Sequence, residues 1–167
     1  MRFLAALAAA TAIFAGPALA GPVPVTEVRS GLEQRAATVT CRPKLEGKNT
    51  VKTFTVDLAR AESAARNAGL TTGKSGDPHR YHNGDGLVFN KNNCDKKDAI
   101  LWEYPVYWEG IKGDWQKDTK TDKQPNGPTP LRAVYANANG GIVFCGVMTH
   151  STVTAKNQGK AFFQLCT

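Results

Sequence analysis

Residues 57–69 read DLARAESAARNAG, and this stretch decides the class of the fold. Asp57 has the short acceptor side chain that caps the start of a helix, and Gly69 has the backbone freedom that ends one. Between them the apolar residues recur at the spacing of one helical face: Leu58, Ala61, Ala65 and Ala68. The pattern predicts a helix over 58–68, and no other segment predicts one as clearly.

Strand-like segments lie on both sides of this helix. Val39–Val56 holds two short runs around Gly47-Lys48-Asn49, which predicts an N-terminal β-hairpin. Gly73–Gly86 is rich in Gly, Asp, Asn and Pro and is expected to be irregular. Four further strands are expected: Ala99–Val106, Pro130–Ala136, Ile142–His150 and Gln158–Cys166. One helix followed by several strands indicates an α+β domain, an antiparallel β-sheet packed on one α-helix.

The first 35 residues differ from the rest. A positive start at Met1-Arg2, the apolar run Phe3–Ala15 and small residues up to Ala20 predict a secretory signal peptide over 1–20. A core helix is the alternative, but Gly16-Pro17 would break it. Residues 21–35 end in Arg35 and are expected to be a pro-segment, with an ordered arm as the alternative. Residues 36–167 then form one secreted domain of 132 residues.

Four cysteines fall in this domain: Cys41, Cys94, Cys145 and Cys166. In an oxidising compartment an even number indicates two disulfides, and four cysteines allow three pairings. A zinc site is the alternative, but the sequence has no Cys-x-x-Cys or comparable ligand spacing. We therefore expect two disulfides.

The domain is basic, since residues 36–167 keep 18 basic and 12 acidic residues, a net charge of +6. This balance favours a polyanionic partner, either a nucleic acid or an anionic membrane surface. The long insert 108–128 concentrates the candidate contacts: Lys112, Trp115, Lys117, Lys120, Lys123 and Asn126. Lysines with an aromatic residue suit phosphate contact and base stacking, and a solvated surface loop is the alternative.

Three charged or titratable residues interrupt apolar strands. Glu103 lies in ILWEY, Arg132 in PLRAVY, and His150 ends GVMTH, while His79 comes from the irregular segment. Each alone has a structural explanation, a buried ion pair or a hydrogen-bonded histidine. Two-residue periodicity allows Glu103, Arg132 and His150 to lie together on one sheet face, which we expect. A carboxylate, an arginine and histidines on one face suit phosphodiester transfer by general acid–base catalysis.

We expect this chemistry to need no cofactor and no metal. A carboxylate takes the proton of a ribose 2′-hydroxyl, an imidazolium protonates the leaving 5′-oxygen, and the arginine holds the phosphate. The chain offers no cluster of carboxylates, and His79 and His82 form an H-x-x-H without a third ligand in place.

Four segments carry a resemblance to a known family: GDPHRY (76–81), LWEYP (101–105), GPTPLRAVY (127–135) and CGVMTH (145–150). They resemble fungal ribotoxins, in particular the short insecticidal members. The likeness runs from about Val39 to Cys166 and includes all four cysteines. It implies the fold of small guanyl-specific extracellular ribonucleases and cleavage of one bond in the sarcin–ricin loop of large ribosomal RNA.

The resemblance also implies residue roles. Glu103 would be the base, His150 the acid, Arg132 the phosphate holder and His79 an electrostatic helper. Tyr135 and Phe163 match positions that line the site, and the disulfides would be Cys41–Cys166 and Cys94–Cys145. Where larger ribotoxins have a tyrosine this chain has Asp77, as the short members do, and its carboxylate should hold His79 charged.

The sequence therefore predicts a secreted, monomeric ribotoxin that acts on ribosomal RNA and ribosomes and meets acidic phospholipid membranes during cell entry. One alternative is a digestive guanyl-preferring ribonuclease, which would share the same active site. The other is a non-enzymatic basic effector that binds RNA or membranes. Such a binder would not need Glu103, Arg132 and His150 within its strands.

Overall fold

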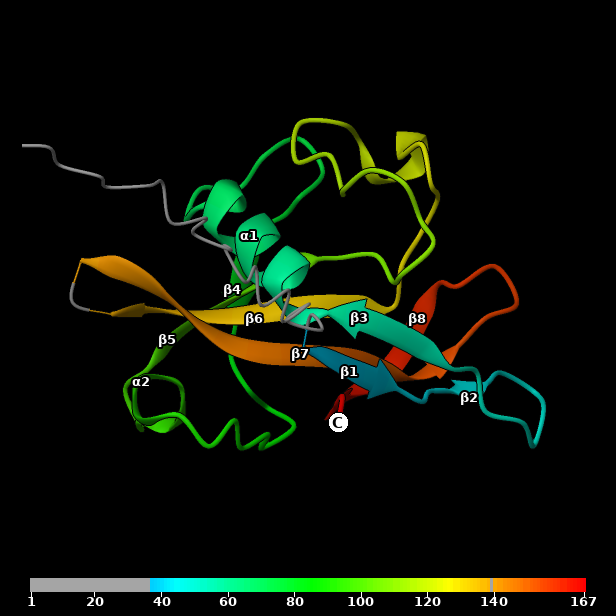
Figure 1. The fold of residues 1–167 in the computed structure, drawn as a ribbon, viewed down its shortest axis with the longest axis horizontal. Coiled ribbons are helices and arrows are strands. Elements are labelled where there is room, and N and C mark those ends of the chain that lie inside the picture. The colour runs from blue at the N-terminus through cyan, green and yellow to red at the C-terminus, as the bar shows by residue number, and fades with distance from the viewer. Residues whose placement is uncertain (1–36, 139) are drawn as a thin grey trace, which may run out of the picture. The chain divides into compact units, whose positions relative to one another are not determined.

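The computed structural model describes residues 37–138 and 140–167, and Figure 1 shows their arrangement. The predicted signal peptide over 1–20 and the predicted pro-segment over 21–35 lie outside the described residues. No helix among the described residues is long and apolar enough to cross a membrane.

A six-stranded sheet forms the centre of the fold, in the order β2-β7-β6-β5-β4, with β8 also paired to β7, over Met148–Val153. Neighbouring strands are antiparallel except for β2 and β7, which are parallel. The strands span β2 Lys44–Leu45, β4 His79–Tyr81, β5 Ile100–Pro105, β6 Leu131–Ala138, β7 Gly141–Val153 and β8 Gly159–Leu165. The expected α+β class with an antiparallel sheet is confirmed.

The N-terminal hairpin is formed by β1 (Thr38–Cys41) and β3 (Phe54–Asp57), which pair antiparallel as a separate two-stranded sheet. The chain turns between them through a hydrogen bond from the Leu45 amide to the Thr50 carbonyl, 2.8 Å long. The short strand β2 within this connection pairs with the end of β7. The expected hairpin is therefore present, and β2 also joins it to the main sheet.

Helix α1 spans Leu58–Ala68, as the sequence predicts. The Asp57 carboxylate accepts a 3.0 Å hydrogen bond from the Arg60 amide, and Gly69 ends the helix with φ at +69°. The buried face consists of small side chains, Ala61, Ala64, Ala65 and Ala68, while Leu58 is half-buried. Alanines let the helix axis approach the sheet closely.

Three short elements depart from the prediction. Segment 73–86 is not wholly irregular, because β4 forms within it by pairing with β5. A four-residue helix α2 (Asn92–Asp95) and a 3-10 turn η1 (Thr121–Lys123) accompany α1. Elements of three or four residues are too short to show a period, and β4 depends on a partner strand that is distant in sequence.

The sheet has a separate apolar core on each face. On one face α1 and the hairpin pack on residues that include Tyr104, Ala133, Tyr135 and Val147. On the other face, segment 82–99 covers Leu101, Val134, Ala136 and Met148. We call these the helix face and the open face.

All four cysteines are disulfide-bonded, which removes the zinc alternative for them. Cys41 is joined to Cys166 and Cys94 to Cys145, the pairing that the family resemblance implies. The first joins the hairpin to the C-terminal end of the chain, and the second holds α2 against β7 on the open face.

Candidate active site

The strands bring the four candidate catalytic residues to the open face. Residues that are opposite each other in an antiparallel pair point to the same face, and a two-residue step along a strand keeps that face. His79 of β4 is opposite Glu103 of β5. Pro105, two residues after Glu103, is opposite Arg132 of β6. Arg132 is in turn opposite Met148 of β7, which is two residues before His150. The grouping expected from strand periodicity therefore has a structural basis.

Glu103 is only 4% exposed, yet its carboxylate is not fully paired. Oε1 accepts from His79 Nε2 at 2.9 Å and lies 3.7 Å from Arg132 Nε. Oε2 is buried and has no hydrogen-bond partner among the described residues. A buried carboxylate oxygen without a partner costs folding free energy, so a purely structural ion pair does not explain this residue.

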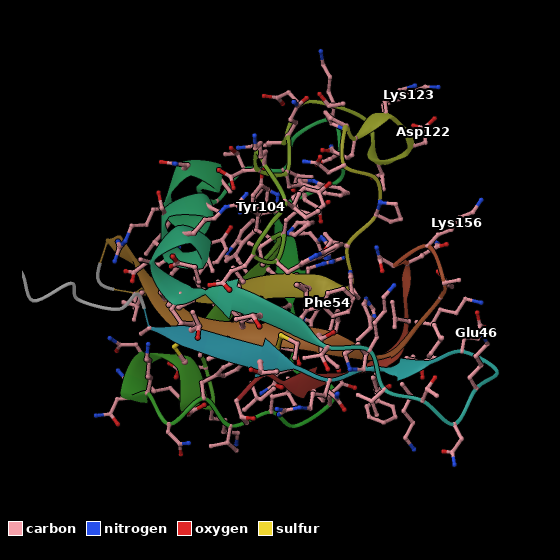
Figure 2. All side chains as sticks on the ribbon, turned by 45° about the vertical axis from the view of Figure 1, so that its right-hand side comes forward. Glu46, Phe54, Tyr104, Asp122, Lys123 and Lys156 are labelled. Atoms are coloured by element: carbon pink, nitrogen blue, oxygen red, sulfur yellow. A yellow bond between two sulfur atoms is a disulfide. The ribbon has the colours of Figure 1, made fainter. Side chains whose placement is uncertain are left out.

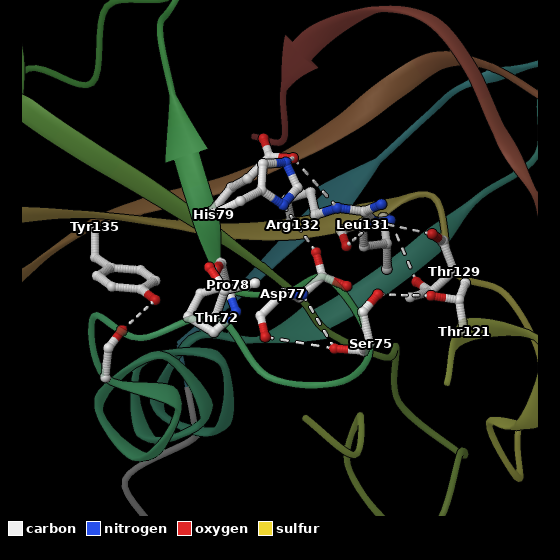
Figure 3. A network of polar contacts seen from close by, with 12 residues as sticks. Thr72, Ser75, Asp77, Pro78, His79, Thr121, Thr129, Leu131, Arg132 and Tyr135 are labelled. Carbon is white, nitrogen blue, oxygen red and sulfur yellow. Dashed lines mark hydrogen bonds and ion pairs between the residues drawn. The ribbon is translucent and has the colours of Figure 1, made fainter. Parts of the chain in front are cut away.

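His79 lies between two carboxylates, as Figure 3 shows for Asp77. Its Nδ1 is 3.1 Å from Asp77 Oδ1, and its Nε2 is 2.9 Å from Glu103 Oε1. The hydrogen bond to Asp77, followed by that to Glu103, raises the pKa of His79 to about 10. His79 is therefore a fixed positive charge at neutral pH, which agrees with the expectation for Asp77.

Arg132 is fixed by the backbone beside it. Its Nη1 donates to the carbonyls of Thr129 at 3.0 Å and Leu131 at 2.9 Å (Figure 3). The side chain is 17% exposed, so the guanidinium reaches the surface of the site. Its Nε is buried and has no hydrogen-bond partner within the described residues, since Glu103 Oε1 at 3.7 Å is too far for a hydrogen bond. A guanidinium held in this way can bind a phosphate without first reorganising.

His150 is half-buried at the other end of the group. Its Nδ1 is 3.0 Å from the Ala161 carbonyl, which leaves Nε2 as the nitrogen that faces a substrate. Its ring packs on Phe163 with centroids 4.1 Å apart. Burial lowers the pKa of His150 from its ordinary value, and the positive charge of Arg132 acts in the same direction. When protonated it is therefore a stronger acid than a free histidine.

The two expected lining residues lie on opposite faces. Phe163 of β8 packs against His150 and, edge-on, against Tyr81 at 5.9 Å, so it belongs to the site. Tyr135 does not, and the prediction for it is wrong. It is fully buried in the helix-face core, where its hydroxyl donates to the Gly69 carbonyl at 2.7 Å (Figure 3). It is three residues from Arg132, and an odd step along a strand reverses the face.

The insert 108–128 is an ordered structure, not a free loop. The buried Gln124 side chain accepts from the Gln116 amide and donates to the Gln116 and Thr119 carbonyls. Thr121 donates to the Ser75 carbonyl at 2.8 Å, which ties the insert to the segment before Asp77. The insert therefore borders the site at one side.

Two of its predicted RNA contacts are used internally. Trp115 is 6% exposed and packs in the helix-face core, so it cannot stack on a base in this conformation. Lys117 donates to the Ala68 carbonyl at 2.7 Å and to Thr71, where it caps the C-terminus of α1. The predicted base stacking by Trp115 is therefore wrong, whereas the phosphate contact of Lys117 stays a prediction for a side chain that also has a structural role.

The other three lysines remain exposed: Lys112, Lys120 and Lys123. Lys123 lies 3.7 Å from Asp122, and Figure 2 shows this pair at the outer end of the insert. A surface pair of this kind is weak and leaves the ammonium available to a phosphate.

Sequence reasoning missed a second basic surface. A groove of about 510 Å³ lies between β4 and segment 82–99, and three of its lining residues are the exposed cations Arg80, Lys96 and Lys97. Asp95, which also lines it, uses its carboxylate to accept from the amides of Phe89 and Lys91. The adjacent lysines were the only signal in the sequence, and without β4 nothing connected them to the site.

No group of three or more His, Cys, Asp or Glu side chains within residues 37–138 and 140–167 is arranged to hold a metal ion. His82, the second histidine of the H-x-x-H, is exposed and lines the groove. His79 is hydrogen-bonded through both ring nitrogens.

The chain is similar to known ribonucleases. A ribonuclease family profile matches residues 39–167. Hirsutellin A from Hirsutella thompsonii is 61% identical, with a TM-score of 0.68, covering 78% of this chain and 98% of its own. Restrictocin, described as a highly specific Aspergillus ribotoxin, is 29% identical with a TM-score of 0.60, covering 78% and 99%. None of the curated protein sequences matches. The chain belongs to the fungal ribotoxin family of ribonucleases and is an endoribonuclease.

Proposed function

We propose that the chain cleaves RNA by transphosphorylation, with Glu103 as base and His150 as acid. Glu103 takes the proton from the 2′-hydroxyl of the ribose, and that oxygen attacks the adjacent phosphorus. The bond from phosphorus to the 5′-oxygen breaks, and the 5′-oxygen takes a proton from His150 Nε2. The products are a 2′,3′-cyclic phosphate and a free 5′-hydroxyl.

The observation that carries this proposal is the unpaired oxygen of Glu103. A buried carboxylate with one oxygen held by His79 and the other without a partner among the described residues can accept a proton at once. His79 stays charged, with a pKa of about 10, so it stabilises negative charge and does not itself compete for the proton.

The neighbouring groups supply the remaining functions. The guanidinium of Arg132 faces the phosphate and offsets the charge that develops on its non-bridging oxygens. Phe163 fixes the orientation of the His150 ring. Base, acid and charge are all provided by side chains, so the proposed mechanism requires no metal.

We further propose that the target is the sarcin–ricin loop of the large ribosomal RNA. Support comes from the 61% identity with hirsutellin A and from the likeness to restrictocin, a ribotoxin of high specificity. The insert that carries the exposed lysines is tied to the segment before Asp77, and these lysines suit contact with the phosphates of a folded RNA.

The test is to incubate purified protein with intact ribosomes and to size the RNA. One discrete fragment from the large RNA is expected. A smear would indicate the digestive ribonuclease instead, and unchanged RNA would leave only a binding protein. A dinucleotide such as GpA, assayed in parallel, measures the chemistry without ribosome recognition.

A lysine variant separates recognition from catalysis. Lys112, Lys120 and Lys123 are changed to Gln, while Lys117 is kept because it caps α1. We expect cleavage of ribosomes to fall and to depend less steeply on salt, with GpA hydrolysis unchanged. The matched control changes three exposed lysines outside the insert: Lys44 and Lys48 in the connection between β1 and β3, and Lys156 in the connection between β7 and β8. If only the control loses ribosome cleavage, recognition lies at the hairpin or at the connection between β7 and β8.

Secretion and membrane contact complete the proposal. Two disulfides in a small domain are typical of exported proteins, so the chain is proposed to act outside the cell that makes it. The net positive charge of residues 36–167 favours anionic lipid surfaces during entry into a target cell. The proposed membrane contact is tested by co-sedimentation: the protein should sediment with vesicles of acidic phospholipid and should not sediment with neutral vesicles.

A further inference from the structure

The imidazole of His150 fills a narrow slot between β7 and β8. Phe163 covers the ring at 4.1 Å between centroids, and the Ala161 carbonyl holds Nδ1 at 3.0 Å. The backbone of Gly159 lies against the ring atoms. A Cβ atom built on Gly159 would be 2.0 Å from His150 Cδ2, 2.5 Å from Cγ and 3.0 Å from the His150 Cβ.

The irregular pairing of β7 and β8 creates this slot. His150 is opposite Phe163, and after a shift in register Val153 is opposite Gly159. Ala161 lies within the irregular stretch with φ at +62°, in the left-handed region. In this conformation the Ala161 carbonyl points toward His150, and the backbone of Gly159 lies close to the ring.

The requirement for glycine at 159 comes from space and not from the backbone. Gly159 does not have φ in the left-handed region, in contrast to Gly47 at +69°, where nothing lies within 4 Å of a built Cβ. An alanine at 159 would therefore suit the local backbone. Its methyl group would collide with Cγ of His150. This atom does not move when the ring rotates about the Cβ–Cγ bond, so ring rotation does not relieve the contact.

We propose that Gly159 is a positioning residue for the general acid: the absence of a side chain at 159 fixes where the His150 ring lies. The proposal rests on the proposed function of His150. With a methyl group at 159, His150 must change its rotamer or β8 must move away. Either change breaks the contact with Ala161 or with Phe163, and Nε2 no longer points at the leaving oxygen.

The experiment compares Gly159→Ala with Gly141→Ala. Gly141 begins β7 at its other end, and its built Cβ meets nothing closer than the Ala138 carbonyl at 4.0 Å. For GpA hydrolysis by Gly159→Ala we expect kcat to fall by roughly 10²-fold, the typical effect of a misplaced group, with KM unchanged. NMR titration should show the pKa of His150 moving back toward its ordinary value. Gly141→Ala should match wild type in both.

Two double variants make the result decisive. Adding Gly159→Ala to His150→Gln should cause no further loss of kcat, because Gly159 acts only through His150. If Gly159→Ala folds poorly, His150→Ala/Gly159→Ala should be nearly as stable as His150→Ala, because the collisions with the ring atoms are removed and only the 3.0 Å contact with the Cβ of residue 150 remains. Wild-type kcat in folded Gly159→Ala, or an instability that persists without the His150 ring, would overturn the proposal.

The proposed function can fail separately. If His150→Gln keeps wild-type activity, His150 is not the acid and the proposed mechanism is wrong. The NMR titration of His150 in Gly159→Ala still tests the slot in that case. An unchanged pKa there shows that Gly159 does not position the ring.

Discussion

The two faces of the central sheet are built from the same strands but have different roles, one in stability and the other in the proposed reaction. On the helix face, Tyr104, Ala133 and Tyr135 pack against α1 in a continuous apolar core. On the open face, the alternate residues Glu103 and Arg132 carry charge, and Glu103 contacts both His79 and Arg132. The helix face is apolar where α1 covers it, whereas the open face has, beside its own apolar core, charges that are only partly paired. We therefore expect substitutions on the first face to change stability and those on the second to change the reaction.

The largest effect is expected for the two proposed proton-transfer residues. Glu103→Gln and His150→Gln should each lower kcat for GpA by about 10²–10⁴-fold, the usual contribution of a general acid or base. Both variants should remain folded, which thermal unfolding checks, although Glu103→Gln also loses the ion pair with His79 and should change in stability. Activity of the double variant near wild type would contradict the mechanism.

A pair of phenylalanines, one on each face, gives the next comparison. Phe54 is buried on the helix face and packs on Trp108 at 4.7 Å, so Phe54→Ala should cost about 3–5 kcal/mol of stability. Phe163 is half-buried against His150, so Phe163→Ala should lower kcat with a smaller loss of stability. Urea unfolding and GpA assays on the folded fraction measure both. Equal losses of stability would remove the distinction between the faces.

Local signals explain what the sequence could predict. Helix α1 was predicted at both ends because Asp57 and Gly69 act within a few residues of their own position. The strand β4 was missed because it forms only on β5, and the paired residues, from Tyr81 with Leu101 to His79 with Glu103, are 20 to 24 positions apart in the sequence. Its register is also what places His79 beside Glu103, so this contact could not be derived from the residues alone.

The errors in the site have one physical cause. A motif shows which residues are near each other in sequence but does not show the face on which each side chain lies. Tyr135 shares a segment with Arg132 and points the opposite way. Trp115 and Lys117 have the residue types of an RNA contact, but the helix face uses them for packing and for capping α1. Exposure, which decides these cases, depends on tertiary structure.

The charge network of the open face predicts a pH-dependent stability. The pKa of His79 is about 10 in the folded chain, above its ordinary value of 6.5, because of hydrogen bonds to Asp77 and Glu103. A raised pKa contributes stability that is complete below pH 6.5 and is lost as the pH rises to about 10. The side chain is 47% exposed, so solvent screening keeps the effect modest.

Asp77→Asn tests this contribution. The variant should lose less stability than wild type between pH 6.5 and pH 10, because the hydrogen bond that raises the pKa of His79 most is weakened. Thermal unfolding at several pH values within this range measures the difference, and NMR titration reports the pKa of His79 directly. Identical pH profiles for both proteins would show that Asp77 does not hold the charge.

The smallest effect is expected where the resemblance and the structure disagree. The resemblance assigns Tyr135 to the site, whereas the structure places its hydroxyl 2.7 Å from the Gly69 carbonyl under α1. Tyr135→Phe removes one buried hydrogen bond and should cost about 1 kcal/mol, with GpA hydrolysis unchanged. Tyr104→Phe is the matched control, since its hydroxyl donates to the Trp115 carbonyl at 2.8 Å on the same face. If Tyr135→Phe lowers kcat tenfold while Tyr104→Phe does not, Tyr135 reaches the substrate and the two faces are not independent.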